Sequence, residues 1–311
     1  MSNFTGTREA FAAALFDLAK DDNSVMLVSS DSLKAMRATK FAAEYPTQYV
    51  EVGIAEQAAV ASAAGMAASG LKPFVATYAG FLTMRACEQM RTFTAYPNLN
   101  VKFIGVNSGV VGGEREGVTH QFYEDLGILS SIPNFTIFTP ADAGQTYHAV
   151  KEANKINGPV YIRAGSGREP DVFPKDTPFN PDGVSLLNDY GEDVAIFASG
   201  FIMDRVLAAT ELLRNDGIKV RVSDVNILGA KKTGEKILEI MKNAKLAVTV
   251  EDHNINGGLG SFVCQLACEN APKRVKRIGL TSFAESGPAA ELADHYGFSA
   301  EGIAAAVKAE L

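Results

Sequence analysis

Glu56 stands in a segment made almost entirely of very small residues, and this setting gives a carboxyl group unusual chemistry. Residues 55–68 contain eight alanines and one glycine, so a helix formed by them can approach another backbone closely. A carboxyl group enclosed in such a contact is held away from water, and it can donate a proton or a short hydrogen bond to a cofactor nitrogen. The alternative is a structural role, in which Glu56 only complements the dipole of the helix N-terminus.

Two aromatic residues and a histidine follow predicted strands farther along the chain. Tyr78 and Phe81 come after the predicted strand 73–77, where they could present a flat ring to a planar ligand or serve only as core residues. His120 lies in a glycine-punctuated segment after the predicted strand 101–106. The carboxyl ends of parallel strands are where α/β proteins bind ligands. A histidine placed there can act as an acid, a base or a hydrogen-bond donor to substrate oxygens.

Two arginines, Arg163 and Arg168, flank a glycine-rich loop after the predicted strand 160–163. Guanidinium groups suit phosphate and other oxyanions, although two solvated surface charges would give the same pattern. His253 follows two acidic residues, and the sequence leaves its role open. The glycine-rich segment 256–261 lacks the full spacing of a dinucleotide-binding loop, so a tight turn before a helix suffices to explain it.

The elements that must position these residues alternate between short strands and longer alanine-rich helices. This order predicts an α/β fold with two domains, each a mainly parallel sheet flanked by helices. Between residues 169 and 190 lie four prolines and no helical or strand period, which indicates a linker. The predicted domains are therefore residues 1–168 and 191–311. The predicted strands are 25–29, 73–77, 101–106, 135–138, 160–163, 194–198, 219–223, 246–250 and 275–279.

Composition excludes several classes of function. The 311 residues carry a net charge of −7 and a pI near 5.3, so binding to nucleic acid or to an anionic membrane is not expected. Three cysteines cannot form a disulfide framework, and no metal-ligand spacing accompanies them, so we expect a reducing compartment and no metal site on this chain. The N-terminal residues lack the pattern of a signal peptide and no apolar run could span a membrane. A cytoplasmic location is expected.

Together, three short runs identify a resemblance. Residues 49–57 (Tyr-Val-Glu-Val-Gly-Ile-Ala-Glu-Gln), 77–81 (Thr-Tyr-Ala-Gly-Phe) and 117–121 (Gly-Val-Thr-His-Gln) resemble, in order and separation, the pyrimidine-binding domain of the transketolase family. These enzymes depend on thiamine diphosphate. The resemblance is strongest in residues 49–125, and it continues through residues 250–258 into the family's C-terminal domain.

The resemblance implies cofactor contacts. Glu56 matches the glutamate that hydrogen-bonds N1′ of the aminopyrimidine, a contact that promotes the tautomer needed to activate the thiazolium carbon. Phe81 matches the aromatic residue that stacks on the pyrimidine, with Tyr78 nearby. Asp31 lies in a segment, residues 29–32, that is close to the cofactor in relatives.

The resemblance also implies substrate contacts. His120 matches a histidine that faces the substrate hydroxyls, and Arg168, with Arg163, falls where the family binds a substrate phosphate. Two positions depart from the usual pattern: Asn107 replaces a second active-site histidine of many transketolases, and Met84 replaces an aromatic residue. An unusual ketose carrying phosphate or another anion is therefore expected.

A missing motif predicts a partner. The family binds the diphosphate through Mg²⁺ with a Gly-Asp-Gly motif followed by an Asn, and this sequence contains no Gly-Asp-Gly. We expect a separate N-terminal transketolase subunit that carries the diphosphate-binding domain and the Mg²⁺ ligands. The pair would form an α2β2 heterotetramer and transfer a two-carbon ketol unit from a ketose phosphate to an aldose.

Two other functions fit parts of the sequence. The beta subunit of a 2-oxoacid dehydrogenase, or half of a deoxyxylulose-phosphate synthase-like enzyme, would share Glu56 and the fold. The segment 117–121 and Arg168 favour sugar phosphates over oxoacids. A non-catalytic regulatory module of the same fold is the alternative from another class, and the retained Glu56, Phe81 and His120 count against it.

Overall fold

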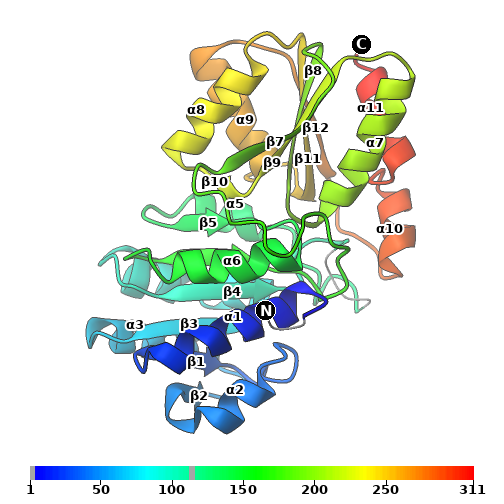
Figure 1. The fold of residues 1–311 in the computed structure, drawn as a ribbon. Helices are drawn as coiled ribbons and strands as arrows, with labels where there is room; N and C mark the ends of the chain where they lie inside the picture. The colour runs from blue at the N-terminus through cyan, green and yellow to red at the C-terminus, as the bar shows by residue number, and fades with distance from the viewer. Residues whose placement is uncertain (1–3, 112–115) are drawn as a thin grey trace.

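The structure is a computed structural model that describes residues 4–111 and 116–311, and it contains two β-sheets (Figure 1). The larger sheet has seven strands in the order β10-β5-β6-β4-β3-β1-β2. Its pairings are parallel except for that of β10 with β5. The strands are β1 (Val25–Ser29), β2 (Tyr49–Glu51), β3 (Lys72–Tyr78), β4 (Lys102–Val106), β5 (Thr136–Phe138), β6 (Val160–Arg163) and β10 (Ile227–Leu228).

Helices cover both faces of this sheet because successive strand residues pack on opposite sides. Leu27 belongs to the core beneath α1 (Thr7–Asp21) and α6 (Ala143–Ala153), which lie side by side on one face. Its neighbour Val28 belongs to the core on the other face. The elements that cover that face are α3 (Glu56–Ala68), α4 (Cys87–Gln89), α5 (Asp125–Ser130) and two π-helical segments, η2 (Phe81–Arg85) and η3 (Met90–Ala95). Two shorter elements precede β2: the helix α2 (Thr39–Glu44) and the 3-10 turn η1 (Pro46–Gln48).

The second sheet has five strands in the order β12-β11-β8-β9-β7, parallel except for β7 with β9. In Figure 1, α8 and α9 lie on one side of it, and α7, α10 and α11 on the other. The predicted fold class is confirmed. The elements are β7 (Val184–Asp189), β8 (Val194–Ser199), η4 (Gly200–Ile202), α7 (Met203–Asn215), β9 (Val220–Val225), α8 (Lys231–Met241), β11 (Leu246–Asn254), α9 (Leu259–Asn270), β12 (Val275–Leu280), α10 (Ala289–His295) and α11 (Ala300–Lys308).

The predicted linker needs a correction. Strand β7 lies inside residues 169–190 and pairs antiparallel with β9, so the end of this segment belongs to the second sheet. The four prolines all precede β7. They correctly indicate that the chain between the two sheets has no regular structure there, but they do not predict the strand that follows. In addition, β10 leaves the second half of the chain to join the edge of the first sheet, an exchange that alternation alone does not predict.

The two sheets share buried contacts. The core formed by α3 and α5 continues into Val225, Leu228 and Leu259 of the second half. Asp224, at the end of β9, accepts a 2.6 Å hydrogen bond from Gln145 Nε2 of α6. Burial raises the pKa of the Asp224 carboxyl from 3.8 to about 7; the Gln145 bond lowers it and nearby Asp142 raises it further. No helix in residues 4–111 and 116–311 is long and apolar enough to cross a bilayer.

We expect the substitution Asp224→Asn to stabilise the protein more at about pH 8 than at about pH 4. The Asp224 pKa is higher in the folded protein than in the unfolded chain, so between about pH 4 and pH 7 the unfolded chain loses this proton first. The wild type loses stability over that window, whereas Asn has no proton to lose. One pKa unit equals ~1.4 kcal/mol, and the variant's advantage in urea unfolding is expected to grow by at least that amount. If the variant and the wild type differed in free energy of unfolding by the same amount at both pH values, the raised pKa of Asp224 would be contradicted.

Candidate active site

Glu56 is the first residue of α3, and the turn before this helix directs its side chain into the domain. Gly53 adopts a left-handed φ of +70°, a conformation that glycine adopts without strain. Ala59 and Ala63 are fully buried on the next turns of the helix, so α3 lies close against the sheet. Glu56 is only 5% exposed, as the small residues around it predict.

The predicted aromatic residues and the histidine meet beside this helix. The ring centroids of Tyr78 and Phe81 are 5.3 Å apart, and the His120 ring lies 5.3 Å from each of them in edge-to-face geometry. Phe122 packs against Phe81 from the other side at 5.4 Å. Gly80 leaves room for the Phe122 ring, because a Cβ there would overlap it. Residues from the ends of β3 and β4 therefore form one aromatic cluster around His120.

Arg85, which the sequence patterns did not single out, joins this cluster to Glu56. Its guanidinium stacks over the Phe81 ring at 3.8 Å from the centroid, and its Nη1 donates to Glu56 Oε1 at 3.1 Å. Gln57 Nε2 donates to the Arg85 carbonyl at 3.0 Å. The π-helical turn Phe81–Arg85 brings Arg85 over the Phe81 ring, and π-helical turns are frequent at functional sites.

A second arginine, Arg8, contacts Asn107, which directly follows β4. Arg8 is 5% exposed, and it donates from Nε to the Gly165 carbonyl at 3.3 Å and from Nη2 to Asn107 Oδ1. Asn107 has a left-handed φ of +58°, which asparagine tolerates better than most residues. Position 107 therefore holds an amide in contact with a buried arginine.

Asp252 of β11 fixes the start of the same loop from the other domain. Its carboxylate oxygens accept from Val110 N at 2.7 Å and from Val111 N at 2.8 Å, and the residue is fully buried. Gly109 has a φ of +79°, and a Cβ there would overlap this carboxylate. His253 is fully buried: its Nδ1 lies 2.7 Å from the Asn254 carbonyl, and burial lowers the pKa of its imidazole to about 4.

We expect Asp252→Asn to lower the free energy of unfolding by ~1.5–3 kcal/mol, the contribution of a hydrogen bond to a charged group. The amide turns one of the two acceptor atoms into a donor that faces a backbone N–H of residue 110 or 111. Urea unfolding of the wild type and the variant measures the loss. An unchanged free energy of unfolding would show that Asp252 does not hold the start of this loop.

The structure does not support the predicted substrate contact of Arg163. Its side chain is 2% exposed and forms an ion pair with the fully buried Asp125 at 3.0 Å. Its Nη2 donates to the Asp252 carbonyl at 2.8 Å, and Tyr161 Oη donates to Asp125 at 2.7 Å. A substrate cannot reach this guanidinium because the second domain covers the end of β6. Arg163 is a structural residue that ties the two domains together.

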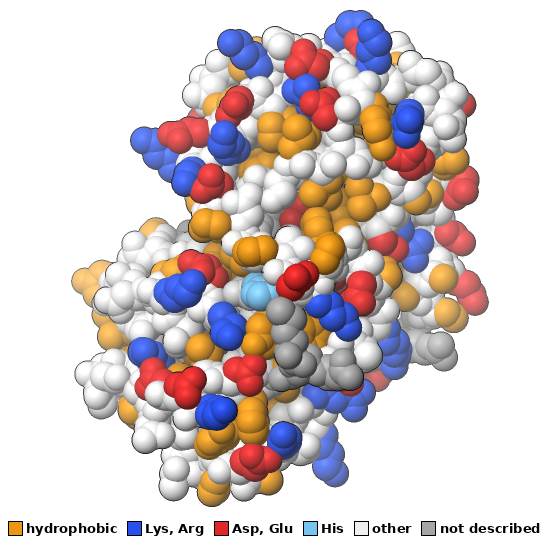
Figure 2. Space-filling model, in the orientation of Figure 1, with side chains coloured by type: hydrophobic (Ala, Val, Ile, Leu, Met, Phe, Trp, Pro, Cys, Tyr) orange, Lys and Arg blue, Asp and Glu red, His pale blue; other side chains and the backbone are white. Residues whose placement is uncertain are grey.

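The remaining predicted residues lie at the surface. Arg168 is exposed on the loop after β6, next to a cavity between the two domains. Asp31 is exposed, with a left-handed φ of +50°, and its backbone N–H donates to Glu51 Oε1 at 2.7 Å. Figure 2 shows a waist between the two lobes in which apolar side chains gather. In residues 4–111 and 116–311, no group of three or more His, Cys, Asp or Glu side chains could hold a metal ion.

Comparisons with known proteins agree with this geometry. The family model described as "Transketolase, pyrimidine binding domain" matches residues 5–167, and "Transketolase, C-terminal domain" matches residues 183–303. The chain is 36% identical to an apulose-4-phosphate transketolase subunit of Phocaeicola vulgatus, over 97% of this chain and 96% of that protein. It is 31% identical to a 6-deoxy-6-sulfo-D-fructose transketolase subunit of Clostridium sp. (strain MSTE9), over 95% and 91%.

Among solved structures, a split-gene transketolase described as an inactive beta4 tetramer is similar. The TM-score is 0.86 at 35% sequence identity, and the match covers 98% of both chains. Both domain models, the two relatives and this structure agree on the same assignment. The chain belongs to the transketolase family, and it carries that family's pyrimidine-binding and C-terminal domains in this order.

Proposed function

We propose that this chain is the beta subunit of a two-chain, thiamine diphosphate-dependent transketolase that transfers a two-carbon ketol unit from an anionic ketose to an aldose. One observation carries the proposal: Glu56, Arg85, Phe81 and His120 form a continuous series of contacts at the carboxyl ends of β2, β3 and β4. Family membership alone would also fit a regulatory module, but such a module would not need this series.

The residues fit a thiamine cofactor. The Arg85 guanidinium, a flat cation, lies on the Phe81 face and hydrogen-bonds Glu56. A flat aminopyrimidine bound here would need the same two contacts, stacking on the ring and a hydrogen bond to the carboxylate. Arg85 is half-exposed, at 49% of its side chain, so it has room to move aside. When bound, thiamine diphosphate supplies a carbon nucleophile that can take up the ketol unit.

Each residue of this chain then has a separate task. Glu56 holds a proton at the aminopyrimidine nitrogen, and Phe81, with Tyr78 behind it, orients the ring. His120 faces the substrate side of the cluster, where it donates to hydroxyl oxygens or moves a proton. Asp252 and Gly109 keep the loop before His120 in place. We keep Arg168 and Asp31 as candidates for the substrate anion and for a cofactor contact.

A partner supplies what this sequence lacks. No Gly-Asp-Gly occurs in its 311 residues, and relatives of matching length are described as subunits of transketolases. These facts support a separate subunit that binds the diphosphate and Mg²⁺, in an α2β2 assembly. The sparse cysteines support a reducing, cytoplasmic setting.

Activity of the reconstituted pair tests the proposal. The chain is mixed with the partner subunit, thiamine diphosphate and Mg²⁺, and two reactions are followed: ketol transfer from ketose phosphates to aldoses, and decarboxylation of 2-oxoacids. We expect transfer only with both chains present and no release of CO₂. Decarboxylation without transfer would favour the dehydrogenase or synthase alternative, and no reaction of either kind would favour the regulatory module.

We expect His120→Asn to lower kcat/KM by ~10²-fold, the lower end of what a positioned acid or base contributes. Asn keeps a hydrogen-bonding group but cannot transfer a proton. The matched control is His295→Asn, because His295 is exposed at the end of α10 and contacts the Tyr296 ring edge-to-face. The control should keep kcat/KM within about twofold. Equal values for the two variants would remove His120 from the reaction.

A further inference from the structure

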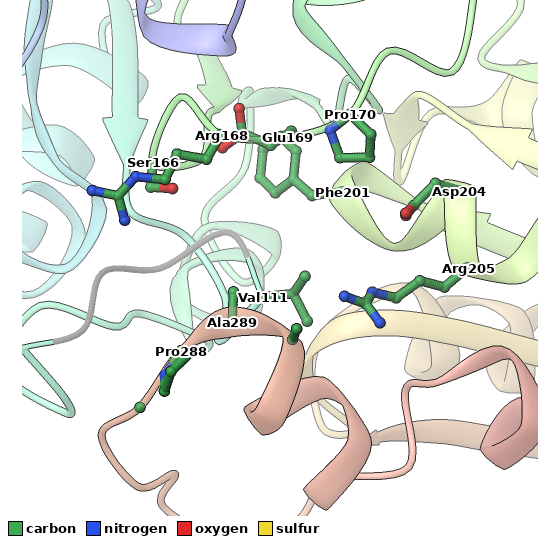
Figure 3. A pocket seen from close by; sticks show the side chains of 12 residues that line it. Val111, Ser166, Arg168, Glu169, Pro170, Phe201, Asp204, Arg205, Pro288 and Ala289 are labelled. Carbon is green, nitrogen blue, oxygen red and sulfur yellow. The ribbon is translucent and has the colours of Figure 1, made fainter.

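A cavity of about 300 Å³ lies between the two domains, beside the site already described. Its walls are the loop after β6, the start of α7 and the start of α10. In Figure 3, Asp204 and Arg205 extend from α7 toward the space that Val111 and Ala289 face from the other side. The Arg168 guanidinium points away from Asp204, past Ser166.

The polar groups of this cavity point to a ligand. Asp204 Oδ1 is buried and accepts no hydrogen bond from the described residues, which is uncommon for a buried polar atom. Burial raises the pKa of the Asp204 carboxyl, and the backbone N–H and the charge of Arg205 oppose that rise. Arg205 lies next to it and, within residues 4–111 and 116–311, forms no salt bridge. The cavity therefore presents a cation that could take an anion and a carboxyl oxygen that could accept a hydroxyl.

The rest of the lining strengthens both interactions. Val111, Phe201, Pro170 and Pro288 make most of the wall apolar, and charge-assisted hydrogen bonds are stronger in apolar surroundings. Glu169 also lines the cavity, but its carboxylate already accepts hydrogen bonds from Thr7 Oγ1 and from Gly167 N. Ser166 adds one hydroxyl at the edge of the first domain. A guanidinium and a carboxyl group held side by side, with an added hydroxyl, suit a small molecule that carries both an oxyanion and hydroxyl groups.

The cavity is connected to the His120 loop. Val111, which lines it, is held by Asp252. Gly117 lies against Ser286, the residue before the cavity wall at 287–290. The His120 backbone N–H donates to the Gly117 carbonyl at 2.9 Å. The turn from Gly117 to His120 therefore connects the residue beside Ser286 to the histidine.

We propose that this cavity is a binding site for hydroxylated oxyanions of the sugar phosphate or sugar sulfonate class, with Arg205 holding the anion and Asp204 accepting a hydroxyl. Two sources share this chemistry: the distal end of the ketose that reacts at His120, or a separate sugar phosphate. The first source rests on the proposed function. The site itself does not, because it is formed by residues of this chain alone.

Calorimetric titration of the full chain tests the site without cofactor or partner. The probes are ribose 5-phosphate and inorganic phosphate. We expect the wild type to bind ribose 5-phosphate, and Arg205→Gln to weaken that binding at least tenfold. Arg214→Gln is the matched control, since Arg214 lies on the same helix, is exposed and pairs with Glu211; its affinity should match the wild type. Asp204→Asn should reduce the preference for ribose 5-phosphate over inorganic phosphate.

Two results would overturn the proposal: no binding of ribose 5-phosphate by the wild type, or unchanged affinity in Arg205→Gln. Thermal unfolding of each variant checks that it is folded. Kinetics of the reconstituted pair then distinguish the two sources. A raised KM for fructose 6-phosphate, but not for fructose, in Arg205→Gln assigns the site to the substrate. Unchanged kinetics together with lost binding assign it to a separate sugar phosphate. Failure of the proposed function would leave the titration result intact.

Discussion

Replacement of Glu56 by Gln is expected to lower kcat of the reconstituted enzyme by at least ~10²-fold, within the range that a positioned acid or base contributes. The Glu56 carboxyl is enclosed between α3 and the π-helical turn that carries Arg85, and within residues 4–111 and 116–311 only Arg85 hydrogen-bonds its side chain. Gln has nearly the same shape and can still hydrogen-bond, but it cannot hold or release a proton. The loss should therefore fall on kcat, with a smaller loss in cofactor affinity.

A nearby carboxylate provides the control. Glu88 is exposed on α4 and lies beside Gln89, so Glu88→Gln should leave kcat within about twofold of the wild type. Circular dichroism and thermal unfolding establish that both variants are folded. If Glu56→Gln kept full activity, Glu56 would only complement the helix dipole, and the proposed use of the cofactor would be wrong.

The largest expected effect on stability belongs to the buried pair of Arg163 and Asp125. Removal of one member of a buried ion pair costs ~3–5 kcal/mol, because the other charge is left without a partner. Burial alone would raise the pKa of the Asp125 carboxyl, but the Arg163 charge and the hydrogen bonds from Arg163 and the Tyr161 hydroxyl hold it below its ordinary value. We expect Arg163→Met to lower the free energy of unfolding in urea by about that amount.

Two further variants show whether the pair itself is the cause. Arg214→Gln removes an exposed arginine whose pair with Glu211 is open to water, and surface pairs contribute only ~0–1 kcal/mol. The double variant Arg163→Met with Asp125→Leu removes both charges, and it should recover part of the loss. If the double variant lost as much free energy of unfolding as the two single variants together, the loss would come from packing and not from the uncompensated charge.

The sequence predicts those residues of the site that follow the ends of neighbouring strands. Tyr78 and Phe81 follow β3, and His120 follows β4, which is the hydrogen-bonded neighbour of β3. Residues that follow neighbouring parallel strands meet at one edge of the sheet. For Glu56, the small residues of α3 already indicate close packing. These inferences need only the order of elements and the size of side chains.

The residues that sequence reasoning missed or misplaced depend on contacts that order does not reveal. Arg85 reaches Phe81 through a π-helical turn, which an ordinary helical period does not predict. The resemblance implies a substrate role for Arg163, but the Asp252 carbonyl of the second domain accepts a hydrogen bond from its guanidinium. Asp252 itself stands in a strand whose packing partner lies about 140 residues earlier in the chain. Only the docking of the two domains brings these residues together.

Capture of the tagged chain from its native host, followed by assay of the captured material, tests the central claim most directly. The account predicts one stoichiometric partner that carries Gly-Asp-Gly with a downstream Asn, and ketol transfer that requires added thiamine diphosphate and is lost with Glu56→Gln. Recovery of the chain only with copies of itself, with no ketol transfer after cofactor is added, would contradict the two-chain enzyme. It would favour a non-catalytic module of the same fold.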